Sequence, residues 1–315
     1  MMNKRTLKTV TRTQGNNRAL KQGAVRLPDF TLDFEEVNPL PRAFRAMVRE
    51  QAYDVSEMAL TTYITARAYG VPITAIPVFL VRDFHHKSMV ASAKANLQHL
   101  KDLEGRRVGV SRGYTVTTGV WARAILAEEH GVDLSKITWA RSDDEHVPNW
   151  RMPTNVQDLG GGKSSLEDQL ARGDIDAAVG VVAGDATRSL IADPFAAGLA
   201  ALKSRGFYPI NHLVVVRDDI LVEVPELAEQ LFDAFSASKR AYLADLKAGR
   251  IAELTAADKT SLAVMDVMDD PLPYGIAPNA DILNNLMDHV IAQGIIDARI
   301  PLEKLFAANT QELIG

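Results

Sequence analysis

Alternation of apolar and polar residues predicts the first strands of the chain. Phe30, Leu32 and Phe34 alternate with polar residues, which is the period of a half-buried strand. Residues 71–81 instead form a nearly continuous apolar run broken by Pro72 and Pro77, which predicts a buried strand. The same patterns predict further strands at 6–13, 53–60, 108–110, 137–140, 175–182 and 207–216.

Helical spacing separates these strands. Leu40, Phe44, Met47 and Val48 recur at helical intervals behind an Asn–Pro start signal. Ser165 and Asp168 predict a capping box for a helix over 166–171. Further helices are predicted at 61–69, at 116–125 and beyond 225, whereas 146–163 predicts a loop. Strands that alternate with helices favour an α/β protein with parallel sheets.

Composition excludes several classes of function. The 315 residues suffice for two lobes, each with a core of its own. The net charge is −5 and Lys and Arg are scattered, so the chain lacks the basic surface that a nucleic-acid partner requires. Cysteine is absent, which removes disulfides, thiolate metal sites and cysteine nucleophiles.

The start of the sequence indicates in which cellular compartment the protein resides. Residues 6–13 hold only Leu7 and Val10 as apolar residues, so they predict a short strand and not the apolar core of a signal peptide. No later window reaches the length of about 18 apolar residues that a membrane span needs. We therefore expect a cytoplasmic protein without a membrane partner, unless the natural chain carries an export signal ahead of this sequence.

Several segments resemble known families. Residues 96–110 (NLQHLKDLEGRRVGV) and 165–178 resemble the second lobe of type II periplasmic binding proteins. Five other segments are similar, in order along nearly the whole chain, to the 4,5-dihydroxyphthalate decarboxylase family: 54–58 (DVSEM), 84–86 (FHH), 119–123 (GVWAR), 208–212 (YPINH) and 269–275 (DDPLPYG). The chain departs from that family at His85, Lys87 and 111–114, which leaves the exact substrate open.

The resemblance implies a two-lobed type II periplasmic-binding-protein-like α/β fold. Lobe one would comprise 1–83 and 214–315, lobe two would comprise 84–213, and two crossing strands would form a hinge beside a ligand cleft. The implied function is decarboxylation of a hydroxylated aromatic acid, with a small aromatic carboxylate as the partner. A non-catalytic solute-binding protein serving a transporter or sensor is the alternative, and an enzyme of the same architecture acting on another carboxylate is a third.

Decarboxylation of an aromatic ring needs a proton donor and a group that polarises a phenol oxygen. His86 and His212 match family histidines and are the candidates for acid/base chemistry, since histidine titrates near neutral pH. Structural roles at a hinge or in the core are the alternatives for both. Glu57, at a strand end, could orient a histidine or accept a phenol proton, or else cap the helix that follows.

The substrate carboxylate needs an anchor. Ser111 to Thr118 lie between a strand and a helix, where backbone amides and the helix dipole favour an anion. Arg112, Thr117 and Thr118 could add side-chain donors, with ordinary helix capping as the alternative. Arg82 and Arg18 could clamp a carboxylate, or form surface ion pairs.

Two other motifs are set aside. Residues 160–165 (GGGKSS) are similar to a nucleotide phosphate loop, but Gln157 stands where that motif requires glycine and no apolar strand precedes it. His85 and His86 are adjacent and lack the spacing of metal ligands. We expect a reaction without a cofactor, while a divalent metal and a homo-oligomer stay open.

Overall fold

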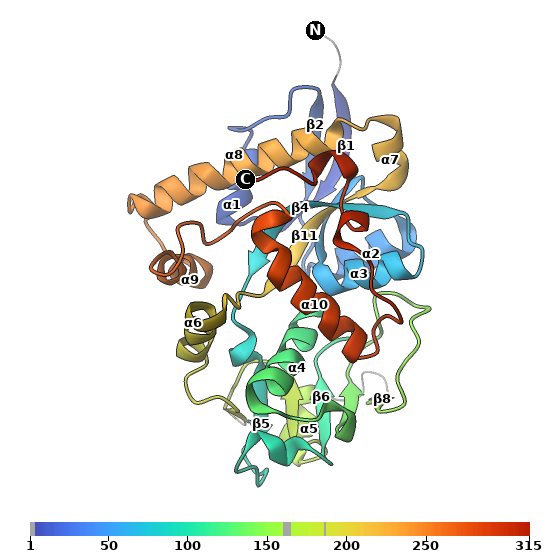
Figure 1. Ribbon diagram of the computed structural model, residues 1–315, viewed down its shortest axis with the longest axis vertical. Coiled ribbons are helices and arrows are strands. Elements are labelled where there is room, and N and C mark those ends of the chain that lie inside the picture. Colours follow the sequence, from blue (N-terminus) through green and yellow to red (C-terminus); the bar gives the residue numbers. More distant parts are fainter. Residues whose placement is uncertain (1–3, 160–164, 186) are drawn as a thin grey trace. The chain divides into compact units, whose positions relative to one another are not determined.

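The computed structural model describes residues 4–159, 165–185 and 187–315, and it divides into two compact units (Figure 1). Unit 1 comprises the residues up to Asp83, Ile210–Asn284 and Ile300–Gly315. Unit 2 comprises Phe84–Pro209 and Asn285–Arg299.

This division differs from the sequence-based one in two respects. The chain returns to unit 1 at Ile210 instead of at residue 214, because the final strand of unit 1 begins there. Residues Asn285–Arg299 were expected in the first lobe but group with unit 2. The chain therefore passes from one unit to the other four times, whereas two hinge crossings were predicted.

The core of unit 1 is a five-stranded sheet in the order β2-β1-β3-β11-β4. Strands β1, β2 and β3 are parallel, and β11 is antiparallel to both β3 and β4. Every residue of β3 is buried, as expected for a strand covered on both faces. The strands are β1 (Arg5–Val10), β2 (Phe30–Glu35), β3 (Val55–Ala59), β4 (Ile73–Arg82) and β11 (Ile210–Arg217).

Helices pack around this sheet, and α8 (orange) runs beside α1 in Figure 1. Gly15 at the start of α1 makes this approach close, since a Cβ there would lie 2.2 Å from the ring of Tyr242 in α8. The helices that start in unit 1 are α1 (Gly15–Lys21), α2 (Pro41–Glu50), α3 (Leu60–Ala68), α7 (Asp218–Glu223), α8 (Leu227–Lys247), α9 (Ala256–Met265) and α10 (Ala280–Ala292).

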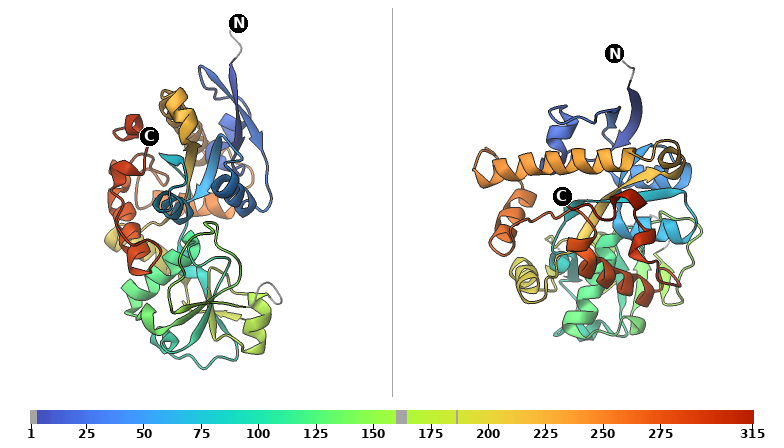
Figure 2. Two further views of the ribbon diagram at one scale, coloured as in Figure 1. Left: turned by 90° about the vertical axis from the view of Figure 1, so that its right-hand side faces the viewer. Right: turned by 45° about the horizontal axis from the view of Figure 1, so that its top comes forward.

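Unit 2 contains a six-stranded sheet in the order β10-β5-β9-β6-β7-β8, with α4 and α5 on opposite faces (Figure 2). Strands β6, β7, β8 and β9 run parallel to one another, whereas β5 is antiparallel to both of its neighbours, β9 and β10. The strands are β5 (Met89–Ser92), β6 (Arg107–Val110), β7 (Thr138–Arg141), β8 (Val156–Asp158), β9 (Ala177–Val179) and β10 (Thr187–Ser189). The helices are α4 (Thr117–His130), α5 (Leu166–Arg172) and α6 (Pro194–Arg205), with short 3-10 turns at η1 (His85–Ser88), η2 (Leu100–Leu103) and η3 (Leu134–Lys136).

Most predicted elements are confirmed, including the capping box between Ser165 and Asp168 at the start of α5. Two predictions at strand level were wrong. The supposed loop over 146–163 contains β8, and the strand predicted over 175–182 is limited to β9 because Gly180 adopts a positive φ of 82°. Among the described residues, no helix has both the length and the apolar character required to cross a membrane.

Candidate active site

The carboxyl ends of the parallel strands of unit 1 meet at one edge of its sheet. Strands β1, β3 and β4 end there at Val10, Ala59 and Arg82, and the antiparallel β11 begins there at Ile210. Ligand sites of open α/β sheets form at this edge, because the loops beyond the strand ends converge on it. Three of the predicted site residues, Glu57, Arg82 and His212, belong to the strands that meet here.

Glu57 and His212 form a hydrogen-bonded pair at this edge. His212 lies opposite Ala59 in the ladder between β11 and β3, two residues along the strand from Glu57, so both side chains share one face of the sheet. The Nδ1 atom of His212 lies 2.6 Å from Glu57 Oε1. Since an ionised carboxylate only accepts hydrogen bonds, Nδ1 carries the proton of this contact and Nε2 is the ring nitrogen that does not face Glu57.

The carboxylate of Glu57 is fully buried, yet both of its oxygens have partners. The backbone N–H of Arg12, in the loop after β1, donates to Oε2 at 2.9 Å. A buried carboxylate is costly unless it is paired and hydrogen-bonded, so these two contacts hold the charge in place. The result is a fixed negative charge against one side of the His212 imidazole.

The His212 ring is held by packing and remains accessible. It meets Phe44 of α2 edge-on, with ring centroids 5.2 Å apart at 85°. Its side chain is 18% exposed, whereas that of Glu57 is 0% exposed. A buried acid that orients a partly exposed histidine can stabilise the imidazolium while the outer nitrogen gives or takes a proton.

Three arginines of unit 1 lie on the elements that follow or end strands of this sheet: Arg12, Arg18 and Arg82. Arg82 ends β4 and its guanidinium donates to Asn279 Oδ1. Arg12 supplies its backbone to Glu57 and has an exposed side chain. Arg18 is exposed on α1. The pKa of Asp258 is lowered, against the effect of burial, by hydrogen bonds from Tyr242 and Thr255, and the charge of Arg18 adds a smaller contribution. Arg18 therefore lies at α1 with Asp258 nearby, while Arg82 belongs to the strand next to His212.

His86 lies in unit 2, in a closed environment. Its side chain is 0% exposed, and Nε2 lies 3.0 Å from Glu129 Oε2. Phe207 meets the ring edge-on at a centroid distance of 6.4 Å, and Arg205 also donates to Glu129. This burial inside η1, between α4 and α6, favours the structural alternative for His86.

The loop between β6 and α4 binds a carboxylate, but the carboxylate is the protein's own. Glu145 Oε1 accepts the N–H of Tyr114 at 2.6 Å, and Oε2 accepts the N–H and the hydroxyl of Thr115 at 3.1 and 2.7 Å. Arg141 adds an ion pair at 3.5 Å. A Cβ at Gly113 would lie 2.4 Å from Oε2, so only glycine leaves room for this contact.

The residues predicted to anchor the substrate in this loop are therefore largely buried or engaged in hydrogen bonds within the protein. Ser111 donates its backbone N–H to Val179 in β9, and Arg112 adopts a positive φ of 64° while donating its N–H to Ser142. Thr117 is 1% exposed and Thr118 is half-buried at the start of α4. The amides that the sequence assigned to a substrate carboxylate at 114 and 115 hold Glu145 instead.

Metal ligation was also left open by the sequence. Within residues 4–159, 165–185 and 187–315, no three His, Cys, Asp or Glu side chains gather as a metal site would require. Most of the excluded GGGKSS motif, residues 160–164, lies outside the described residues.

Comparison with known proteins identifies the family. Residues 39–262 match the family of periplasmic substrate-binding proteins of phosphonate ABC transporters. A 4,5-dihydroxyphthalate decarboxylase of Comamonas testosteroni is 29% identical over 306 residues, 92% of each chain. Another from Pseudomonas putida is 32% identical over 187 residues, 57% of this chain and 72% of that one. The chain belongs to the 4,5-dihydroxyphthalate decarboxylase family.

This family shares its fold with transport proteins. The periplasmic aliphatic sulphonate binding protein SsuA of Escherichia coli superposes with a TM-score of 0.55 at 10% identity, covering 96% of this chain and 92% of that one. The periplasmic-binding-protein-like fold predicted from the sequence is therefore confirmed. At such identity the likeness concerns the fold alone, so the decarboxylase family's chemistry must be argued from its side chains.

Two residues that make these contacts, one in each unit, were missed from sequence. Glu145 follows β7 by four residues, and β7 is the neighbour of β6, so its side chain reaches the loop after β6. Arg12 follows β1 in the same way beside β3. The available signal was a polar residue just after a predicted strand, but it becomes useful only once the strand order is known.

Proposed function

We propose that this protein is a carboxy-lyase that removes carbon dioxide from a hydroxylated aromatic carboxylate, with His212 as the proton donor and Glu57 as its orienting acid. The observation that carries the proposal is the 2.6 Å contact between His212 Nδ1 and the buried Glu57 carboxylate at the carboxyl edge of the unit 1 sheet. Two relatives named 4,5-dihydroxyphthalate decarboxylase support the choice of substrate class.

The chemistry requires one proton transfer and one bond cleavage. The substrate phenol oxygen pushes electrons into the ring, and the imidazolium of His212 gives its Nε2 proton to the ring carbon that bears the carboxylate. The bond between that carbon and the carboxylate then breaks, its electron pair returns to the ring, and carbon dioxide leaves. Water returns a proton to His212, so each turnover takes up one proton.

Glu57 acts in this scheme by position and charge. It does not touch the substrate, but it fixes the imidazole through Nδ1 and stabilises the protonated ring by its negative charge. Because the carboxylate is fully buried, water screens this attraction weakly. Removal of the charge should therefore affect the rate of the chemical step more than substrate affinity.

Arginines of unit 1 suit the anionic substrate. Arg12 has an exposed side chain and is the residue whose own backbone N–H binds Glu57, and Arg82 ends the strand beside β11. A guanidinium can bind a carboxylate through two parallel hydrogen bonds, which fixes the ring as well as the charge. We assign to Arg12 and Arg82 the binding of a substrate carboxylate, and Arg18 on α1 can add to the positive field.

The test is carbon dioxide release from purified protein supplied with 4,5-dihydroxyphthalate and with mono- and dihydroxybenzoates. We expect turnover of at least one of these acids. His212→Gln and Glu57→Gln should each lower kcat by about 10²–10⁴-fold, the usual contribution of a positioned acid or base, with KM much less changed.

His86→Gln is the matched control, because His86 also pairs with a glutamate but lies buried in unit 2. It should lower stability while the kcat of the folded fraction stays within a few-fold of wild type. Loss of turnover in His86→Gln with full turnover in His212→Gln would refute the assignment. Tight binding of the acids without any release of carbon dioxide would instead favour the solute-binding alternative that the matched transporter family suggests.

A further inference from the structure

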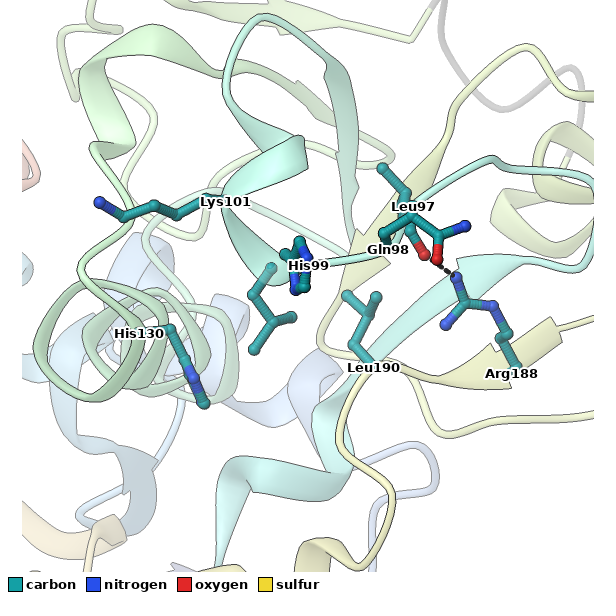
Figure 3. Close-up of a pocket in the computed structure, with 8 residues that line it drawn as sticks. Leu97, Gln98, His99, Lys101, His130, Arg188 and Leu190 are labelled. Atoms are coloured by element: carbon teal, nitrogen blue, oxygen red, sulfur yellow. Dashed lines mark hydrogen bonds between the residues drawn. The ribbon is translucent and has the colours of Figure 1, made fainter.

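Unit 2 contains a concave site whose lining does not include Glu57 or His212. It is a cavity of about 360 Å³ formed by the segment before η2, the last residue of α4 and the end of β10 (Figure 3). This volume falls in the range of roughly 300–1,000 Å³ typical of small-molecule sites. The lining residues all belong to unit 2 and are Leu97, Gln98, His99, Leu100, Lys101, His130, Arg188 and Leu190.

The charged groups of this lining are all basic. Lys101 and Arg188 carry positive charges, two histidines accompany them, and no carboxylate lines the cavity. The nearby Asp102 is already engaged, since its Oδ2 accepts the backbone N–H groups of Gln98 and His99 at 2.7 and 2.8 Å. The lining itself therefore contributes only positive charge, from Lys101 and Arg188.

Two polar groups have unused hydrogen-bonding capacity. Arg188 donates one N–H to the Leu97 carbonyl at 2.8 Å, which positions the guanidinium and leaves its other donors without a described partner. His130 Nε2 is buried and has no hydrogen-bond partner among the described residues. Figure 3 shows His99 and Leu190 between His130 on one side and Arg188 on the other, so the two groups flank the cavity. Buried polar atoms are normally satisfied, so an unsatisfied one beside a cavity points to a ligand.

Lys101 has a separate role at this site. Its Nζ would lie 3.8 Å from a Cβ at Gly131, the residue that caps the C-terminus of α4. An ammonium there compensates the negative end of the helix, which would otherwise repel an anion. Arg188 is then the cationic group that can bind the acidic head of a ligand, and Leu97, Leu100 and Leu190 supply apolar contacts.

We infer that this cavity binds a small organic anion with one carboxylate or phosphate head and an apolar body. Arg188 binds the head, the leucines contact the body, and His130 donates to or accepts from a polar substituent. The inference is independent of the proposed decarboxylation, because none of the lining residues belongs to unit 1.

Isothermal titration calorimetry with benzoate, phenyl phosphate and inorganic phosphate tests this site. We expect at least one of the two organic anions to bind with one-to-one stoichiometry and more tightly than inorganic phosphate, which lacks an apolar body. Arg12→Met, which removes a group assigned to carboxylate binding in the proposed active site, should bind the same anion unchanged, which separates this site from the proposed active site.

Two variants localise the binding. Arg188→Met keeps the aliphatic stem but removes the charge and should weaken binding at least tenfold, while Leu190→Phe should weaken it by filling the cavity. Lys203→Met, on the exposed face of α6, is the matched loss of one charge away from the cavity and should change nothing. Absence of binding by all three probes, or binding that survives both Arg188→Met and Leu190→Phe, would overturn the inference.

Discussion

Glu145 illustrates how a single side chain can take over a site that backbone geometry prepares for an anion. The N–H groups of Tyr114 and Thr115 converge on its carboxylate, and the absence of a Cβ at Gly113 admits it. All three loop residues are buried, so no solvent replaces Glu145 if it leaves. At the scale of the residue, the contact should therefore contribute strongly to the stability of unit 2.

Glu145→Ala should lower the free energy of unfolding by about 1–3 kcal/mol, because two buried amides and a hydroxyl lose their acceptor. Gly113→Ala should cost a similar amount by displacing the same carboxylate, and the double variant should cost less than the sum, since both changes break one contact. Urea unfolding followed by tryptophan fluorescence gives these values. Asp185→Ala, at an exposed position of the same unit, should change the free energy of unfolding by no more than about 0.5 kcal/mol. If the losses of stability in Glu145→Ala and Gly113→Ala simply added in the double variant, the two residues would not act through one shared contact.

At the scale of elements, an ion-pair network joins the part of α10 that groups with unit 2 to two other helices of that unit. Glu128 of α4 accepts from His289 and Asn285 of α10, each at 2.7 Å, and pairs with Arg205 of α6 at 2.7 Å. These contacts, the hydrogen bond from His289 first among them, lower the pKa of Glu128 from 4.5 to about 2. The three helices are thus joined through one carboxylate.

The lowered pKa has a consequence for acid stability. Because the folded pKa lies below the unfolded one, Glu128 stabilises the fold above about pH 4.5 and loses this contribution as the pH falls toward about 2. Glu128→Gln should therefore be less stable than wild type at pH 6, and the difference should shrink on acidification through this window. Urea midpoints at pH 6, 4 and 2.5 measure it, and a gap that stays constant would show that the carboxylate charge is not responsible.

The same elements show what sequence could and could not predict. Strands such as β2 and β11 and the capped helix α5 were predictable because alternation and capping are local. The sequence suggested that Glu57 could orient a histidine but not that the histidine is His212, since their contact depends on β11 lying antiparallel between β3 and β4, and His212 is 155 residues along the chain from Glu57. For His86, residue type suggested catalysis, whereas burial against Glu129 was decided by the packing of η1 on α4 and α6.

At the scale of the whole molecule, two sheets with two cores carry the two proposed sites. The Glu57–His212 pair lies in unit 1 and the anion cavity lies in unit 2. One apolar cluster of unit 2 comprises Val90, Leu166, Leu170, Ile175 and Ala178, and one of unit 1 comprises Tyr242, Leu243, Leu246 and Leu272. This organisation predicts that local damage in one core spreads less to the other than within its own sheet.

Ile175→Ala tests this independence, because it removes a fully buried side chain from the unit 2 cluster and should cost about 2–5 kcal/mol. Hydrogen exchange of its backbone should accelerate in β6 and β9, while β1 and β3 of unit 1 keep their protection. Met58→Ala, at a fully buried position of β3, is the reciprocal variant and should accelerate exchange in unit 1. Equal loss of protection in both units with either variant would mean that the chain unfolds as one cooperative body, and Met58→Ala would then also weaken anion binding in the unit 2 cavity.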